Sequence, residues 1–158
     1  PDSYSGCIVP AGRSHLGYPM HSPLRDAVFP PGRHALYERH RYSPAVRSGG
    51  WLFVSGQVGS REDGSPEPDL DTQVHRAFQN LQAVLQAAGC SFDDVVDVTV
   101  FLVDPPQQLE RIWRILPSYW GEAPYPALTG VGVTWLSGFI LEIKVIAKLP
   151  LDHQKPEL

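Results

Sequence analysis

The sequence predicts an α+β fold in which two helices cover one face of a β-sheet. Residues 69–88 carry apolar side chains at spacings of three and four, which is the period of an amphipathic helix. A second pattern of this kind spans about 106–120. Residues 94–103 and 139–149 are β-branched apolar runs, as expected for buried strands.

The N-terminal part of the chain predicts short strands and a hairpin. In a segment rich in proline and charge, only 27–29 and 35–37 are apolar enough for short strands. Two longer strands at 42–47 and 51–58 flank the turn Ser48-Gly49-Gly50, which is a hairpin signal. The order of elements is therefore β-β-α-β-α-β-β once the glycine-containing strand described below is included.

The two predicted helices have recognisable ends. Asp69 or Asp71 can cap the start of the first helix, and Gly89 stands where a left-handed C-terminal cap belongs. Pro105 suits the first turn of the second helix. Pro117 lies inside that helix and removes a backbone donor, so we expect a kink or a division there.

Residues 124–135, PYPALTGVGVTW, predict a strand that contains two glycines. Alternation places Leu128, Gly130 and Gly132 on one face, and Thr129 and its alternate neighbours on the other. Glycine leaves nothing to pack in a strand, so we expect a ligand, another chain or a tight turn to approach the backbone.

The second face of the sheet also needs cover. The chain offers no third helix to cover this face. We expect the face to carry apolar strand residues in alternation, namely Leu52, Val54, Val98, Val100, Ile143 and Val145. Oligomerisation through that face is therefore expected.

Composition bounds the classes of function. The chain has 158 residues, 42% hydrophobic and 19% charged, which suits one domain with a proper core. A net charge of -4 argues against a nucleic-acid partner, and no apolar run is long enough to predict a membrane span. The two cysteines, Cys7 and Cys90, lack metal-type spacing, so a reduced cytoplasm is the simplest setting.

The first residues differ from the rest of the chain. Residues 1–19 show no helical or strand period and precede Met20, the only methionine. We expect 1–19 to be a leader outside the natural fold and 20–158 to be a single domain. A genuine but irregular N-terminal arm is the alternative.

Few residues offer chemistry. Glu142 interrupts an apolar strand, so its carboxylate is either paired with a cation or placed in a wet pocket as a candidate general acid or base. The glycines of SGQVGS, residues 55–60, expose backbone N–H groups for an anion or a carbonyl, although a simple turn also explains them. His75 lies on the polar side of the first helix and is expected to be solvated, and no histidine has the neighbours of a metal site.

Several segments together are similar to one known family. YSPAVRSGGWLFVSGQVG, AFQNLQAVLQAAGCSFDDVVDVTVFLVD, PYPALTGVGV and LEIKVIA resemble, in this order and spacing, the RidA (YjgF) family. FPPGRHALYERHRYS, SGQVGSREDGSPEPD and VGVTWLSGF resemble its YjgH-type, RutC-like branch. The resemblance covers about residues 28–149.

The resemblance implies a chorismate-mutase-like α+β fold with a mixed sheet, and a homotrimer with small-molecule sites in clefts between subunits. RidA proper hydrolyses 2-imino and enamino acids to 2-keto acids and ammonia, with no metal or organic cofactor. Residue by residue, the family's cleft tyrosine matches Tyr42, its Ser-Gly pair matches Ser55 and Gly56, and its water-positioning glutamate matches Glu142.

This chain lacks the family's carboxylate-binding arginine. Active enzymes have Pro-Ala-Arg-Ser where this chain has Pro126-Ala127-Leu128-Thr129, and a cysteine and an asparagine of the family fall on Gly130 and Ile112. Leu128, Trp135 and the glycines would make a roomier, more apolar substrate pocket. A substitute cation is expected from the neighbouring subunit or from one of three arginines, Arg39, Arg41 and Arg61.

Three functions therefore compete. The first is a hydrolytic deaminase of small imines or enamines, with Glu142 as its catalytic residue. The second is a trimer that binds a small molecule, with an aromatic one as a candidate, without turning it over, which Leu128 favours. The third is a structural or chaperone-like role for the trimer surface, for which no particular residue argues.

Overall fold

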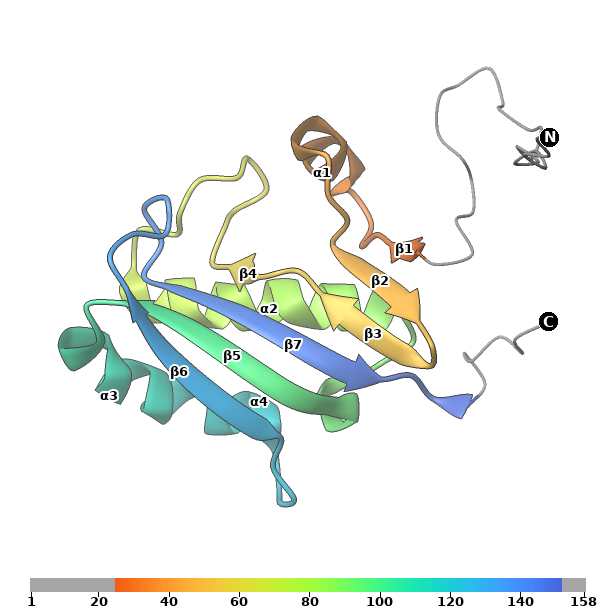
Figure 1. Cartoon of the computed structure of the whole chain (residues 1–158). Coiled ribbons are helices and arrows are strands. Elements are labelled where there is room, and N and C mark those ends of the chain that lie inside the picture. Colours follow the sequence, from red (N-terminus) through yellow and green to blue (C-terminus); the bar gives the residue numbers. More distant parts are fainter. Residues whose placement is uncertain (1–24, 152–158) are drawn as a thin grey trace, which may run out of the picture.

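One mixed β-sheet, with helices on one side, makes up the part of the chain that the computed structural model describes, residues 25–151 (Figure 1). The predicted leader, residues 1–19, lies outside the described residues. The strands are β1 Asp26–Val28, β2 Ala45–Ser48, β3 Trp51–Val54, β4 Gln57–Val58, β5 Val95–Val103, β6 Ala127–Val133 and β7 Leu141–Lys148. The helices are α1 His34–His40, α2 Leu70–Ala87, the 3-10 turn Phe92–Asp94, α3 Pro105–Ile115 and α4 Pro117–Trp120.

The sheet has the order β1-β2-β3-β7-β5-β6, and the short β4 also pairs with β7. Strands β5 and β6 are parallel, whereas the other pairs are antiparallel. The parallel pair is possible because α3 and α4 supply the crossover between its two strands. The α+β class with a mixed sheet is therefore confirmed.

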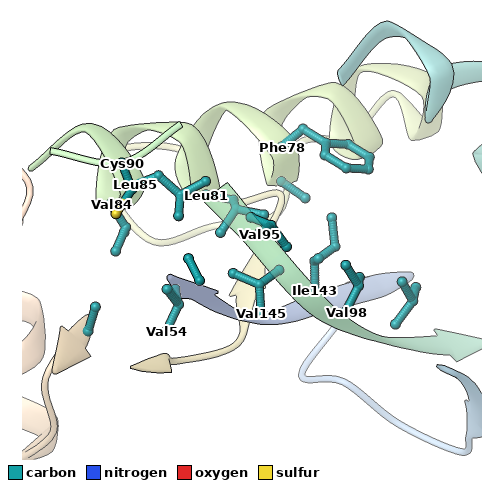
Figure 2. Packing of buried hydrophobic residues seen from close by; sticks show 14 of the residues in the cluster. Val54, Phe78, Leu81, Val84, Leu85, Cys90, Val95, Val98, Ile143 and Val145 are labelled. Atoms are coloured by element: carbon teal, nitrogen blue, oxygen red, sulfur yellow. The ribbon is translucent and has the colours of Figure 1, made fainter. Parts of the chain in front are cut away.

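Helix α2 buries its apolar stripe against the centre of the sheet. Figure 2 shows Phe78, Leu81 and Leu85 of α2 above Val98 of β5 and Ile143 of β7. All five side chains are at most 1% exposed. The predicted ends also hold, because the Asp69 carboxylate accepts from the Thr72 amide at 2.8 Å and Gly89 has a φ of 78°.

The assignment of the sheet faces was wrong in one respect. The six apolar strand residues expected on the uncovered face lie instead beneath the helices, each at most 3% exposed. The opposite face carries a different set, in which Phe53 is 44% and Val131 37% exposed. Period-2 alternation identifies two faces but not which of them the helices choose.

Three local predictions met different outcomes. The apolar triplet at 35–37 is part of α1 and not a strand, because Tyr37 packs edge-on against Tyr42 with ring centroids 4.9 Å apart. The strand at 51–58 is split into β3 and β4. Pro117 divides the second long helix into α3 and α4, as predicted. Within residues 25–151, no helix is both long and apolar enough to cross a bilayer.

Candidate functional site

A cavity of about 470 Å³ opens between α1, β4 and two loops of the chain. This volume lies in the range of small-molecule sites. It is lined by Arg33, Leu36, Tyr37, His40, Tyr42, Gly56, Gln57, Val58, Ser60, Gly64, Ser137 and Phe139. Two of the predicted site residues, Tyr42 and Gly56, are therefore cavity-lining residues.

A β-bulge at Ser55 and Gly56 creates one wall of this cavity. Phe53 pairs with Ile146 and Gln57 with Ile143, so four steps along one strand face three along β7. The Ser55 hydroxyl donates to the Ser43 carbonyl at 2.6 Å, and its amide donates to the Pro44 carbonyl at 2.9 Å. Ser55 thus fixes the bulge and has its hydroxyl donor engaged.

Glu142 lies directly against this bulge. It pairs across the sheet with Val58 of β4 and Phe101 of β5, and a Cβ added to Gly56 would lie 2.7 Å from the Glu142 Cγ. Among residues 25–151, no hydrogen bond or ion pair reaches its carboxylate. Of the two alternatives, the structure therefore favours the half-buried unpaired carboxylate over the ion pair.

The surroundings of Glu142 favour its protonated form. Burial raises the pKa of the Glu142 carboxyl above its ordinary value, and the positive charge of Lys144 opposes this shift without reversing it. A carboxylate with a raised pKa accepts a proton more readily than an ordinary one. Glu142 is thus suited to general acid–base chemistry.

Tyr42 completes this group. Its ring is 47% exposed, and burial, followed by the nearby Tyr37 and Glu142, raises the pKa of its phenol. The hydroxyl therefore remains a neutral hydrogen-bond donor at neutral pH. The structure thus brings together Tyr42, the pair Ser55 and Gly56, and Glu142, which come from three separate parts of the sequence.

The predicted site residues on and after β6 lie elsewhere in a single chain. Leu128 pairs with Val98, and Gly130 with Val100, so both belong to the helix-covered side of the sheet, opposite Glu142. Thr129 pairs with Thr99 on the open face. Trp135 follows β6 and is 73% exposed. None of these four residues, Leu128, Thr129, Gly130 and Trp135, lines the cavity.

The two strand glycines have different explanations. A Cβ on Gly132 would lie 3.1 Å from the Pro105 Cγ, so the start of α3 accounts for this glycine. At Gly130 nothing lies within 4 Å of the position that a Cβ would take. Space is therefore open at Gly130, on the edge strand of the sheet.

Arg33 is a cavity-lining residue that the sequence did not reveal. Its side chain lines the cavity, where Nη1 donates to the Ser60 Oγ at 3.4 Å and Nη2 to the Asn80 Oδ1 at 3.2 Å. The three arginines named as substitute cations, Arg39, Arg41 and Arg61, do not line it. No motif marks Arg33, because its place depends on how α1 packs beside β4.

His75 and Ile112 contact other parts of the fold and do not line the cavity. His75, expected to be solvated, is half-buried, and its Nδ1 lies 2.7 Å from the hydroxyl of Tyr119 on α4. The family asparagine position, Ile112, is fully buried in the core. Within the described ranges, no three histidine, cysteine or acidic side chains gather as a metal site would require.

Fold and cavity together define an α+β protein with a mixed sheet and an unpaired carboxylate beside a small-molecule-sized cavity. The model of the endoribonuclease L-PSP family matches residues 32–149. The chain is 62% identical over 126 residues to the RutC family protein YjgH of Escherichia coli, covering 80% of this chain and 96% of that protein.

A solved structure titled protein YJGH superposes with a TM-score of 0.77 at 62% identity, covering 80% of this chain and 97% of that one. A more distant relative from Dermatophagoides farinae, named 2-iminobutanoate/2-iminopropanoate deaminase, is 31% identical over 97 residues, 60% of this chain and 74% of its own. The chain therefore belongs to the RidA (YjgF) family, in its YjgH-type, RutC-like branch.

Proposed function

We propose that the protein hydrolyses small imines or enamines, and that Glu142 activates the attacking water. The observation that carries this proposal is the unpaired Glu142 carboxylate, with its raised pKa, against Gly56 at the wall of the cavity. The name of the Dermatophagoides relative, an imine deaminase of the same family, supports the same chemistry.

The proposed reaction needs one base and one acid. Glu142 takes a proton from water while the water oxygen bonds to the imine carbon and the C=N π electrons move to nitrogen. The protonated Glu142 then returns its proton to that nitrogen. Glu142 next takes the proton of the new hydroxyl group and passes it to the amine nitrogen, so that the C–N bond breaks, ammonia leaves and the carbon becomes a carbonyl. Imine plus water thus gives carbonyl compound plus ammonia. Tyr42, as a neutral donor, is placed to orient the substrate or the water.

We further propose that a homotrimer completes the cleft. Phe53 and Val131 leave an apolar face exposed, and the resemblance to RidA implies that subunits meet there. Because β6 is the edge strand of the sheet, Leu128, Thr129 and Gly130, together with the exposed Trp135, would then lie near the Glu142 group of a neighbouring subunit. This arrangement would explain why one chain separates two sets of residues that the family brings together.

The substrate test uses 2-imino acids, generated in place from amino acids by an amino-acid oxidase. We expect the protein to accelerate conversion of at least one imino acid to its 2-keto acid, followed as loss of the imine absorbance. If the wild-type chain is inert on all of them and Leu128→Arg gains activity, the scaffold is competent but imino-acid hydrolysis is not its own function.

Leu128 supports a second candidate, a trimer that binds a small molecule without converting it. The bidentate contact that an arginine offers to a carboxylate is absent at this position. This candidate predicts saturable binding with no product. Leu128→Arg would then weaken binding of the natural ligand.

A further inference from the structure

The cavity contains a guanidinium whose charge is not neutralised. The two hydrogen-bond partners of Arg33, Ser60 and Asn80, are both neutral, and no carboxylate pairs with it among residues 25–151. A guanidinium has five N–H donors, so the bonds to Ser60 and Asn80 leave three for another partner. A half-buried arginine in this state is an incomplete anion site.

Hydrogen bonds of Asn80 hold the Arg33 side chain in place. The Asn80 amide nitrogen donates to the carbonyls of Val58 at 2.8 Å and Ser60 at 3.0 Å. Its oxygen is thereby turned toward Arg33. The guanidinium is anchored from α2 through backbone that itself lines the cavity, so little side-chain freedom remains to be lost when a ligand binds.

The rest of the lining favours an anion with an apolar part. None of the twelve lining residues, all within the described chain, is acidic, and His40 adds a second basic side chain. Leu36, Tyr37 and Phe139 supply apolar and aromatic walls. Glu142 contacts Gly56 but is not itself a lining residue, so no carboxylate lines the cavity beside Arg33.

We infer that Arg33 is the anion-binding residue of this cavity, and that the ligand is a carboxylate bearing an apolar or aromatic group. The charged contact missing at Leu128 is thus replaced from a different element, the turn before α1. This inference rests on the proposed function for the identity of the site.

The test compares two probes that differ in one charge, phenylpyruvate and phenylpyruvamide. Dissociation constants are measured by calorimetry with the full chain. We expect the wild type to bind the acid at least about tenfold more tightly than the amide, because a charge-assisted contact is lost with the amide. Arg33→Gln should weaken the acid by about tenfold or more and leave the amide unchanged.

The matched control is Arg39→Gln, on the exposed side of α1 and outside the cavity lining. This variant should bind both probes as the wild type does. Thermal melting checks that each variant is folded. Should Arg33→Gln not fold, Arg33→Lys, which keeps the charge but not the two-point geometry, must still weaken acid binding selectively.

The inference is overturned if the wild type binds neither probe, if it binds acid and amide equally, or if Arg33→Gln leaves acid binding unchanged. Binding and hydrolysis are read separately in these experiments. Selective loss of acid binding in Arg33→Gln upholds the anion site even where no imine is hydrolysed. Imine hydrolysis that is insensitive to Arg33→Gln supports the proposed function and contradicts the anion site.

Discussion

At Gly56 the backbone passes so close to the Glu142 side chain that no substituent fits between them. A methyl group there would press on the Glu142 side chain from its carboxyl group back to Cγ, 2.7 Å away, so the half-buried side chain would have to rotate to make room. We therefore expect Gly56→Ala to change the free energy of unfolding by less than about 1 kcal/mol. Imine hydrolysis should nevertheless fall by about tenfold or more. Denaturant unfolding and steady-state rates measure the two effects.

Gly59→Ala is the matched control for Gly56→Ala. A Cβ at Gly59 would meet the backbone carbonyl of Gln73, with its carbonyl carbon 2.9 Å away, and this backbone is part of α2. Overpacking of this kind destabilises by about 1–3 kcal/mol. Equal stability losses in both variants would contradict the assignment of a movable contact at Gly56.

The raised pKa of Glu142 also predicts how stability depends on pH. A carboxyl that binds its proton more tightly in the folded state stabilises the fold below its unfolded pKa and loses that contribution as pH rises through its folded pKa. Glu142→Gln removes this loss. Its melting temperature should match that of the wild type near pH 4 and exceed it at neutral pH. The reverse order at neutral pH would mean that the ionised carboxylate has a stabilising partner.

Single residues were predictable where they broke a pattern. Glu142 stood out because it interrupts an apolar alternation, and Gly56 because glycine ends a strand. Arg33 breaks no pattern, since arginine is ordinary in a charged segment. Its place in the cavity depends on a hydrogen bond to Asn80, 47 positions away in the sequence.

At the scale of elements, a hydrogen bond joins α2 to α4. The Tyr119 hydroxyl lies 2.7 Å from the His75 Nδ1, while its ring stacks on Phe78 with centroids 4.3 Å apart. Tyr119→Phe keeps the stacked ring and removes the hydroxyl. We expect it to lower the free energy of unfolding by about 0.5–1.5 kcal/mol, measured in denaturant. Its imine hydrolysis should be unchanged, because Tyr119 lies outside the cavity.

Elements with a long apolar period could be predicted from the sequence. The helix at 69–88 carries five turns of apolar spacing, and Pro117 divides its helix by a purely local effect. Helix α1 has only seven residues, too few for a period to be recognised. Tertiary packing of Tyr37, not local preference, decides its conformation.

At the scale of the whole molecule, the open face of the sheet predicts assembly. Phe53→Asp places a charge on that face, whereas Trp113→Asp places one on α3, where Trp113 is 52% exposed. We expect light scattering to give a trimer mass for the wild type and for Trp113→Asp. Phe53→Asp should shift to the monomer, because a buried unpaired charge is costly. A wild-type monomer would contradict the proposed cleft.

The sequence anticipated that one sheet face lacks cover but misplaced the residues on it. In β3 both faces are apolar, so Leu52 and Phe53 are interchangeable as candidates until helix α2 is placed. In β7 the alternation with Glu142, Lys144 and Lys148 does distinguish the two faces. The site was likewise half predictable. Tyr42, Ser55, Gly56 and Glu142 meet within one chain, whereas Leu128, Thr129, Gly130 and Trp135 lie away from the cavity of that chain.

The rate of imine hydrolysis by Glu142→Gln decides whether Glu142 activates the attacking water. Glu110→Gln, on the exposed side of α3, serves as the matched control. If Glu142 activates water, kcat/KM should fall by about 10²-fold or more in Glu142→Gln and stay unchanged in Glu110→Gln. Wild-type kcat/KM in a folded Glu142→Gln variant would contradict the account.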